Sequence, residues 1–360
     1  MGKNFVLSSK CGGGVVKYKK IESIQSISGS TNKSGIRISN DCLYLLWGSL
    51  KIRLQRNLDD YYECQAFSTG KICRTRILRK MSKSGRYTYY AQILFEGLKP
   101  RNICKETGAF KNKIGSGKVG VYVGIRNVTI FDGNQLKQFD FNQGQDVLFA
   151  QIKKNDLAMN RIRRHLNPNK FDAQGHYIAD EPSDWVISNR YIQLKNKNKY
   201  LYKKRTNKIK HIHEKIANEI LAFGNHFVIN VVDGKANAAF RKNEINAYAP
   251  SSFCRILKNK ILDQDGMCQE VHTSNFNYTK YVYEQDRFYK EDEVFQSWIN
   301  FYGTKVHYKW YYAFLFYAYE NGSIQRQNES GLHSFLDSIQ KIENNQNNDK
   351  TGPIMTEERS

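Results

Sequence analysis

One long helix is the strongest structural signal in this 360-residue chain, over residues 188–223. Apolar side chains recur every three or four residues in its second half, the period of a helix with one buried face. They are Ile209, Ile212, Ile216, Ile220 and Phe223. Gly224 follows directly, as glycine often does after a helix. At about 1.5 Å per residue the helix is about 50 Å long, so the rest of the fold must be built around it.

The first half of this helix is strongly basic and has no acidic residue before Glu214. Solvated helices commonly interleave Glu and Lys four residues apart, and this one does not. The pattern therefore favours a surface that contacts a phosphate backbone over an ordinary solvated face. The residues predicted to bind nucleic acid here are Arg190, Lys195, Lys197, Lys199, Lys203, Lys204, Arg205, Lys208 and Lys210.

The composition points to a polyanionic partner. Lys and Arg number 56 against 34 Asp and Glu, a net charge of +22, and 23 Tyr and 20 Phe accompany that charge. Basic and aromatic surface together suit nucleic acid, although a solvated basic surface stays a possible interpretation. The apolar run Trp310–Tyr319 is half the ~20 residues of a membrane span. We expect a cytoplasmic, nucleoid-associated protein that does not bind membrane, and its oligomeric state stays open.

Cysteine and histidine patterns predict neither a metal site nor a cofactor. The seven Cys include no closely spaced pair of the kind that zinc sites use, which indicates ordinary reduced thiols. His211 and His213 lie two apart on the long helix and therefore on different faces.

The N-terminal part predicts a β-rich domain over 21–112, after a flexible segment over 1–20. Short runs of β-forming residues precede a hairpin, in which Cys73–Lys80 and Arg86–Phe95 flank a Ser-Lys-Ser-Gly turn. We expect a small, wedge-like β-barrel. Four basic residues of the hairpin either contact a nucleic-acid backbone or form a solvent face: Arg74, Arg76, Arg79 and Lys80.

The remainder, 113–342, predicts an α/β domain, followed by a disordered tail over 343–360. Three strands come first, and the long helix, a strand, a helix, a strand and an aromatic helix follow. The predicted elements are Lys118–Gly124, Arg126–Phe131, Leu136–Phe141, Phe227–Val232, Phe253–Leu262, Cys268–His272 and Val306–Tyr319. This is the element order of an RNase H-like fold, which makes the whole chain an α+β protein. Arg161, Arg163 and Arg164 precede the long helix and are further predicted nucleic-acid contacts.

Several segments, in this order, resemble TnpB, the transposon-encoded family of RNA-guided nucleases with a RuvC domain. KVGVYVG at 118–124 resembles the first RuvC motif. HEKIANEIL at 213–221, FVINVV at 227–232 and YYAFL at 311–315 resemble the helix before the second motif, that motif, and the helix of the third. SGSTNKSGIRI at 28–38, RYTYYAQILFEG at 86–97 and APSSFCRIL at 249–257 are further matches.

The resemblance implies three catalytic carboxylates, and this chain departs from all of them. The family's Asp, Glu and Asp fall here on Tyr122, Asn230 and Lys309. Phosphodiester hydrolysis on this fold needs two divalent cations about 4 Å apart, held by carboxylates. Two neutral side chains and an ammonium do not supply them, so we expect no catalytic metal.

Nearby acids offer a poor substitute. We expect Asp132 and Asp233 to serve turns, while Asp140 ends a strand. Compared with the family, the helical lobe and the paired-cysteine zinc element are missing or minimal in this sequence.

The resemblance thus implies a nuclease-dead, TldR-type repressor. Its guide RNA would pair with double-stranded target DNA beside a short motif, and the bound complex would block transcription. Three alternatives stay open: an RNA-binding accessory protein of a transposon, an active nuclease with displaced carboxylates, and a decaying transposase remnant.

Overall fold

The computed structural model describes residues 24–82, 84–97, 103–104, 106–178, 185–232, 245–289, 297–326 and 329–350. The chain divides into two compact units. Unit 1 holds residues 1–101 and 188–200, and unit 2 holds 102–187 and 201–360. The predicted flexible segment over 1–20 lies outside the described residues. The domain limits drawn from the sequence stay predictions.

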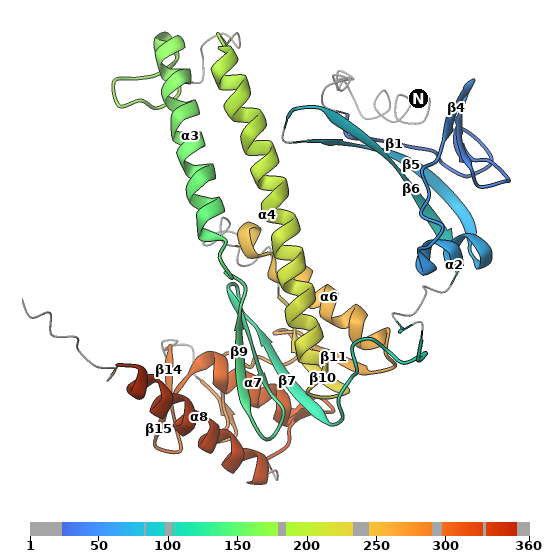
Figure 1. The fold of residues 1–360 in the computed structure, drawn as a ribbon. Coiled ribbons are helices and arrows are strands. Elements are labelled where there is room, and N and C mark those ends of the chain that lie inside the picture. Colours follow the sequence, from blue (N-terminus) through green and yellow to red (C-terminus); the bar gives the residue numbers. More distant parts are fainter. Residues whose placement is uncertain are drawn as a thin grey trace, which may run out of the picture. The chain divides into compact units, whose positions relative to one another are not determined.

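Unit 1 contains two three-stranded antiparallel sheets (Figure 1). One has the order β1-β5-β6 and the other β2-β3-β4, and the helix α2 precedes β5. Their bounds are β1 Ser26–Ser28, β2 Ile36–Ile38, β3 Tyr44–Trp47, β4 Leu50–Arg53, α2 Tyr61–Thr69, β5 Lys71–Met81 and β6 Tyr87–Glu96. The β5–β6 hairpin confirms the one predicted from its turn residues.

The predicted closed barrel is not confirmed. Ile36, Ile38 and Leu45 of the short sheet pack against Ile77 and Ile93 of the long hairpin, face against face. Among the described residues, no strand of the β2-β3-β4 sheet pairs with a strand of the β1-β5-β6 sheet. The described residues of unit 1 therefore form two stacked sheets.

Unit 2 is built on a five-stranded sheet with the order β11-β10-β7-β8-β9. The strands β7, β8 and β9 form an antiparallel meander, and β10 and β11 run parallel to β7. Their bounds are β7 Lys118–Val123, β8 Asn127–Phe131, β9 Leu136–Asp140, β10 His226–Asn230 and β11 Met267–Val271. When the five strands are numbered along the chain, they lie in the order 3-2-1-4-5, and the second strand is antiparallel to the other four. This is the arrangement of an RNase H-like sheet.

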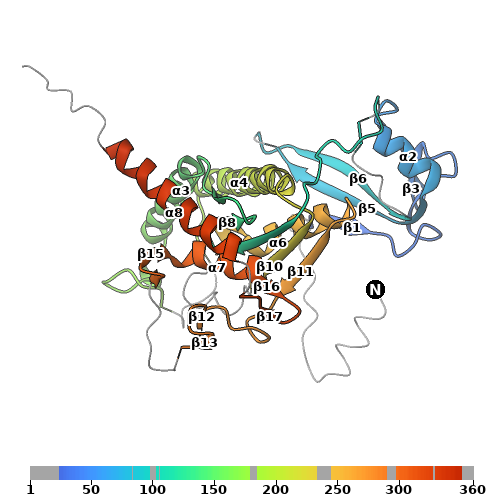
Figure 2. The same ribbon diagram turned by 90° about the horizontal axis from the view of Figure 1, so that it is seen from below.

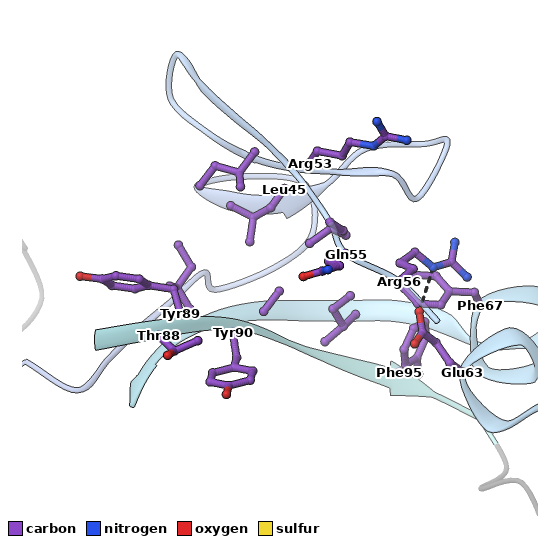
Figure 3. Close-up of a pocket in the computed structure, with 15 residues that line it drawn as sticks. Leu45, Arg53, Gln55, Arg56, Glu63, Phe67, Thr88, Tyr89, Tyr90 and Phe95 are labelled. Atoms are coloured by element: carbon purple, nitrogen blue, oxygen red, sulfur yellow. Dashed lines mark hydrogen bonds and ion pairs between the residues drawn. The ribbon is translucent and has the colours of Figure 1, made fainter. Parts of the chain in front are cut away.

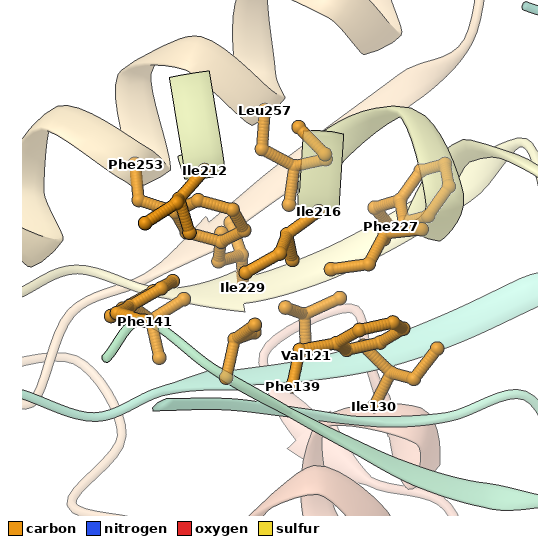
Figure 4. Close-up of a cluster of buried hydrophobic side chains, with 14 of the residues drawn as sticks. Val121, Ile130, Phe139, Phe141, Ile212, Ile216, Phe227, Ile229, Phe253 and Leu257 are labelled. Carbon is orange, nitrogen blue, oxygen red and sulfur yellow. The ribbon is translucent and has the colours of Figure 1, made fainter. Parts of the chain in front are cut away.

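Helices cover both faces of this sheet (Figures 1 and 2). Val119, Val121 and Val123 face a core formed with α4 (Asn189–Leu221) and α6 (Pro250–Leu262). Figure 4 shows Ile212, Ile216, Phe253 and Leu257 packed on the strands in that core. The alternate residues of β7 face α7 (Tyr308–Ala318), and α8 (Glu329–Lys350) joins that second core. The alternation follows from the two-residue period of a strand.

Gly120 lets β7 and α7 approach each other closely. A Cβ atom on Gly120 would lie 2.1 Å from the Ala313 carbonyl oxygen and 2.3 Å from the Tyr317 backbone nitrogen. Both are backbone atoms and cannot move aside as a side chain would. The aromatic helix is therefore held directly against the strand that carries Tyr122.

Other elements were not predicted or begin elsewhere. The helix α3 (Asp146–Leu166) packs on α4 through Leu148, Ile152 and Leu201. Residues 306–307, predicted as the start of the aromatic helix, belong to the strand β15 (Thr304–His307), and α8 continues to Lys350 where the sequence predicted disorder from 343. The remaining short elements are η2 Pro168–Lys170, β12 Tyr281–Val282, β13 Arg287–Phe288, β14 Trp298–Phe301, β15 Thr304–His307, β16 Tyr319–Glu320 and β17 Ser323–Ile324.

Within the described ranges no helix has the length and apolar character needed to cross a membrane. The six described cysteines are free thiols, and burial raises the pKa of Cys254 to about 12 and that of Cys268 to about 11.

His213 lies inside the core on α4, while His211 is exposed, as their spacing predicted. The His213 ring packs 4.9 Å from Phe141 and 5.5 Å from Phe253, measured between ring centroids. Burial lowers its pKa from 6.5 to about 4, against a smaller opposing effect of the Tyr248 backbone. The neutral imidazole is thus the form that fits the fold.

We expect His213 to make the protein less stable in mild acid. Below pH 6.5 the unfolded chain binds a proton at this residue and the folded chain does not. The free energy of unfolding therefore falls as the pH is lowered from 6.5 to 4. The loss is about 2 kcal/mol at pH 5. Urea unfolding at pH 7 and pH 5 should show this slope in the wild type and a flatter one in His213→Leu. His211→Gln, on the exposed face, should keep the wild-type slope. Equal slopes in all three proteins would contradict the assignment.

Candidate functional site

The predicted site residues Tyr122 and Asn230 lie side by side at one edge of the unit 2 sheet. Because β7 and β10 are parallel and paired from His226↔Lys118 to Ile229↔Val121, their carboxyl ends meet at this edge. Both residues occupy strand positions that alternate with the α4-facing core, so both belong to the face covered by α7. Ligands of open α/β sheets bind at this kind of edge.

Tyr122 belongs to a tyrosine cluster, which we define as Tyr122, Tyr278, Tyr308 and Tyr312. The Tyr122 ring centroid lies 5.3 Å from that of Tyr312, 6.1 Å from Tyr308 and 6.5 Å from Tyr278, all edge to face. Burial, with help from the neighbouring tyrosines, raises the pKa of Tyr122 well above its usual value. The cluster fills the space beside β7 with neutral aromatic rings.

Asn230 is buried, and its side chain bonds to the β7 backbone. The Asn230 amide nitrogen donates to the Val123 carbonyl oxygen at 3.0 Å, and the amide oxygen accepts from the Val123 nitrogen at 2.7 Å. Only a side chain with both a donor and an acceptor can make this pair of bonds. The Asn230 side chain thus bridges the two strands where their regular pairing ends.

Lys309 does not face Tyr122. The α7 residues that contact Tyr122 are Tyr308 and Tyr312, which lie one turn apart. The Lys309 ammonium lies 5.8 Å from the centroid of the Tyr308 ring. One residue along a helix turns the side chain by about 100°, so Lys309 points in a different direction from Tyr308 and Tyr312. The four-residue spacing of Tyr308 and Tyr312 was the available signal.

Among the described residues, the acids considered as substitutes for the catalytic carboxylates bond to other groups or lie away from Tyr122. Asp132 accepts from the backbone nitrogens of Asn134 and Gln135 in the β8–β9 turn, as predicted. Asp140 is exposed on β9, two strands away from β7, and accepts from the Asn142 nitrogen. Asp233 lies outside the described residues. Among the residues that the structure describes, no group of three or more His, Cys, Asp or Glu side chains could hold a metal ion.

The basic residues of α4 fall into two groups. Most are exposed, namely Arg190, Lys195, Lys197, Lys199, Lys203, Lys204 and Lys210. Arg205 and Lys208 are partly buried, because Arg205 donates to the Asn246 carbonyl at 3.3 Å and Lys208 to the Gly144 carbonyl at 2.6 Å. Lys210 pairs with Glu214 at 3.7 Å. The exposed lysines between 195 and 204 are therefore the strongest candidates for phosphate contacts.

Two of the predicted cations on β5 lie over tyrosine rings of β6. The Arg79 guanidinium lies 4.2 Å from the Tyr87 ring centroid, and the Lys80 ammonium lies 4.4 Å from that of Tyr90. Arg74 is exposed, whereas Arg76 donates to the Ser28 hydroxyl at 2.8 Å. Exposed tyrosines beside cations make a surface on which bases can stack. The sequence predicted the cations, whereas Tyr87 and Tyr90 were not among the predicted site residues.

Unit 1 also contains a groove of about 720 Å³ between the long hairpin and the short sheet (Figure 3). Arg53, Arg56, Tyr89 and Phe95 are among its lining residues. Arg56 pairs with Glu63 at 3.0 Å and stacks 3.9 Å from the Phe67 ring, which gives it a structural role. Arg53 is exposed at the rim.

Comparisons with known proteins give a weak likeness. No protein-family model and no curated protein match this chain. One similar solved structure is a cryo-EM structure of a Cas12f1–sgRNA–target DNA complex, at 12% identity and a TM-score of 0.36, covering 78% of this chain and 49% of that one. Another is a cryo-EM structure of a CRISPR–Cas12f ternary complex, at 13% and 0.30, covering 71% and 48%.

This chain therefore spans about half the length of the proteins in those structures. The strand order and strand directions of unit 2 are those of an RNase H-like sheet.

Proposed function

We propose that this chain is a nuclease-dead, RNA-guided DNA-binding protein that represses transcription by occupying a target. A guide RNA held by the protein would pair with one strand of double-stranded DNA beside a short motif. Without a cut the complex would persist and block a promoter. The proposal combines the TnpB-like motifs in the sequence with the RNase H-like sheet on which the central ones lie.

The observation that carries the nuclease-dead part is the tyrosine cluster beside Asn230. Two-metal hydrolysis needs carboxylates that converge on a space for two cations and a phosphate. Here aromatic rings pack at 5–7 Å between centroids, and an amide bonds to backbone at the same sheet edge. These contacts support a scaffold that binds without cutting, with no catalytic metal or other cofactor.

The exposed lysines of α4 and the cation–tyrosine pairs of the β5–β6 hairpin support the nucleic-acid part. Affinity would come from phosphate contacts and would fall steeply with salt. Sequence specificity would come from base pairing by the guide.

The first test is sequencing of the RNA that co-purifies with the protein from its native cell, followed by binding of matched and scrambled DNA duplexes. The proposal expects one dominant RNA with a variable end, retention of matched DNA only, and no cutting with Mg²⁺. Guide RNA without DNA retention would favour the accessory RNA-binding protein. Mg²⁺-dependent cutting would establish the displaced-carboxylate nuclease.

A further inference from the structure

The connection between α3 and α4 carries an aromatic stack that the proposed function does not use. The Tyr177 and Trp185 rings stack with centroids 5.6 Å apart and planes 28° apart, and Phe171 packs edge-on against both. The end of α3 adds cations: the Arg163 guanidinium lies 4.4 Å from the Trp185 centroid. We call Phe171, Tyr177 and Trp185, with Arg163, Arg164 and Lys170, the tip platform.

Buried hydrogen bonds fix the tip platform to α3. Asn167, 3% exposed, donates to the Val186 carbonyl at 3.1 Å and accepts from the Val186 nitrogen at 2.8 Å. Its amide nitrogen also contacts the Arg163 carbonyl at 3.0 Å. The residue next to Trp185 is thus tied to the end of the helix, so the stack is held in place before any ligand binds.

One side of the stack stays available to solvent. Tyr177 is 49% exposed although it stacks on Trp185, while Lys170, beneath the aromatic rings, is only 4% exposed. Arg161 and Arg164 are exposed on the same end of α3. Asp172, an acidic residue nearby, is paired with His176 at 3.3 Å.

Cations behind and beside a half-exposed tyrosine suit an unpaired nucleotide. The base can stack on the open side of the ring, because every base has a π-face, and its phosphate can meet the arginines. A neutral peptide would gain little from four cations, and a DNA duplex would offer no unstacked base.

We propose that the tip platform binds an unpaired RNA nucleotide, with its base stacked on Tyr177 and its phosphate beside Arg164. This inference rests on the nucleic-acid-binding part of the proposed function and is independent of guiding, DNA recognition and repression.

The test is photo-cross-linking of the full-length protein to a single-stranded RNA of about 12 nucleotides carrying 5-iodouridine. Mass spectrometry should find a cross-link at Tyr177 or Trp185. Tyr177→Ala should remove it and weaken binding of the same RNA roughly tenfold, the loss of one stacked base. Tyr177→Phe keeps the ring and should keep both the affinity and the cross-link.

Tyr302→Ala is the matched control, because Tyr302 is 48% exposed and packs edge-on against Phe301 elsewhere in unit 2. It should bind like the wild type. Tight RNA binding with cross-links confined to other elements, and unchanged in Tyr177→Ala, would overturn the tip platform alone. A wild-type protein that binds no RNA would overturn both this inference and the proposed function. A protein captured at the tip in place of RNA would also overturn it.

Discussion

Replacing Lys199, Lys203 and Lys204 together with alanine is expected to weaken RNA binding by one to two orders of magnitude at 0.15 M salt. Each phosphate contact to single-stranded RNA contributes about 0.7 to the slope of log affinity against log salt. Three lost contacts therefore lower the slope by about 2. Arg205 is left unchanged, because its guanidinium also packs 5.0 Å from the Phe149 ring and its loss would disturb the fold.

A charge-matched control separates these contacts from net charge. Lys71, Lys118 and Lys258 each pair with a glutamate, namely Glu96, Glu320 and Glu270. Their triple alanine variant also lowers the net charge by three but should keep most of the affinity and slope. Fluorescence anisotropy from about 0.05 to 0.5 M salt, over which the Debye length shortens about threefold, measures both the affinity and the slope. Two variants with the same reduced slope would mean that only the overall charge matters.

Tyr122→Asp is expected to destabilise unit 2 by about 4 kcal/mol or more. The substitution removes a ring that packs against three others and places a carboxylate where neighbouring groups are aromatic. Tyr122→Phe keeps the ring and should cost only about 1 kcal/mol, the value of a hydroxyl hydrogen bond. Urea unfolding of the two variants and the wild type gives both numbers.

A triple variant that includes Tyr122→Asp tests the proposed loss of catalysis. Tyr122→Asp combined with Asn230→Glu and Lys309→Asp should not restore Mg²⁺-dependent cutting, because Lys309 does not face Tyr122 and the space between the strands and α7 is filled. A stable triple variant that cuts guide-matched DNA would contradict this expectation. It would show that the tyrosine cluster does not exclude metal ions and that carboxylates alone are sufficient for the site.

Periodic segments were predictable and irregular ones were not. The isoleucines of α4 and the β-forming runs of β7 and β10 gave these elements to within a few residues, because their burial imposes a clear period. The helix α3 was missed, since its buried positions are few, chiefly Leu148 and Ile152, among many polar residues. Closure of a barrel depends on strand length and twist in three dimensions, which a pattern of alternation does not contain.

Two of the three predicted site positions lie next to each other in the structure. Tyr122 and Asn230 follow continuous β runs, so the register of each strand placed them. On α7 the aromatic residues surround the helix almost completely, and the nine positions from Trp310 to Ala318 include no charged residue that would set its rotation. Tyr177 and Trp185 stack on each other although they lie eight positions apart, and no spacing in the sequence indicates this contact.

Asn230 has a consequence for how this protein can change over generations. Its two bonds to Val123 need one donor and one acceptor, and a carboxylate at 230 would set an oxygen against the Val123 carbonyl in a buried place. A single mutation toward an acid thus loses stability before a metal could bind in return. Asn230 therefore sets a stability barrier against the gain of a metal site at this position by single substitutions.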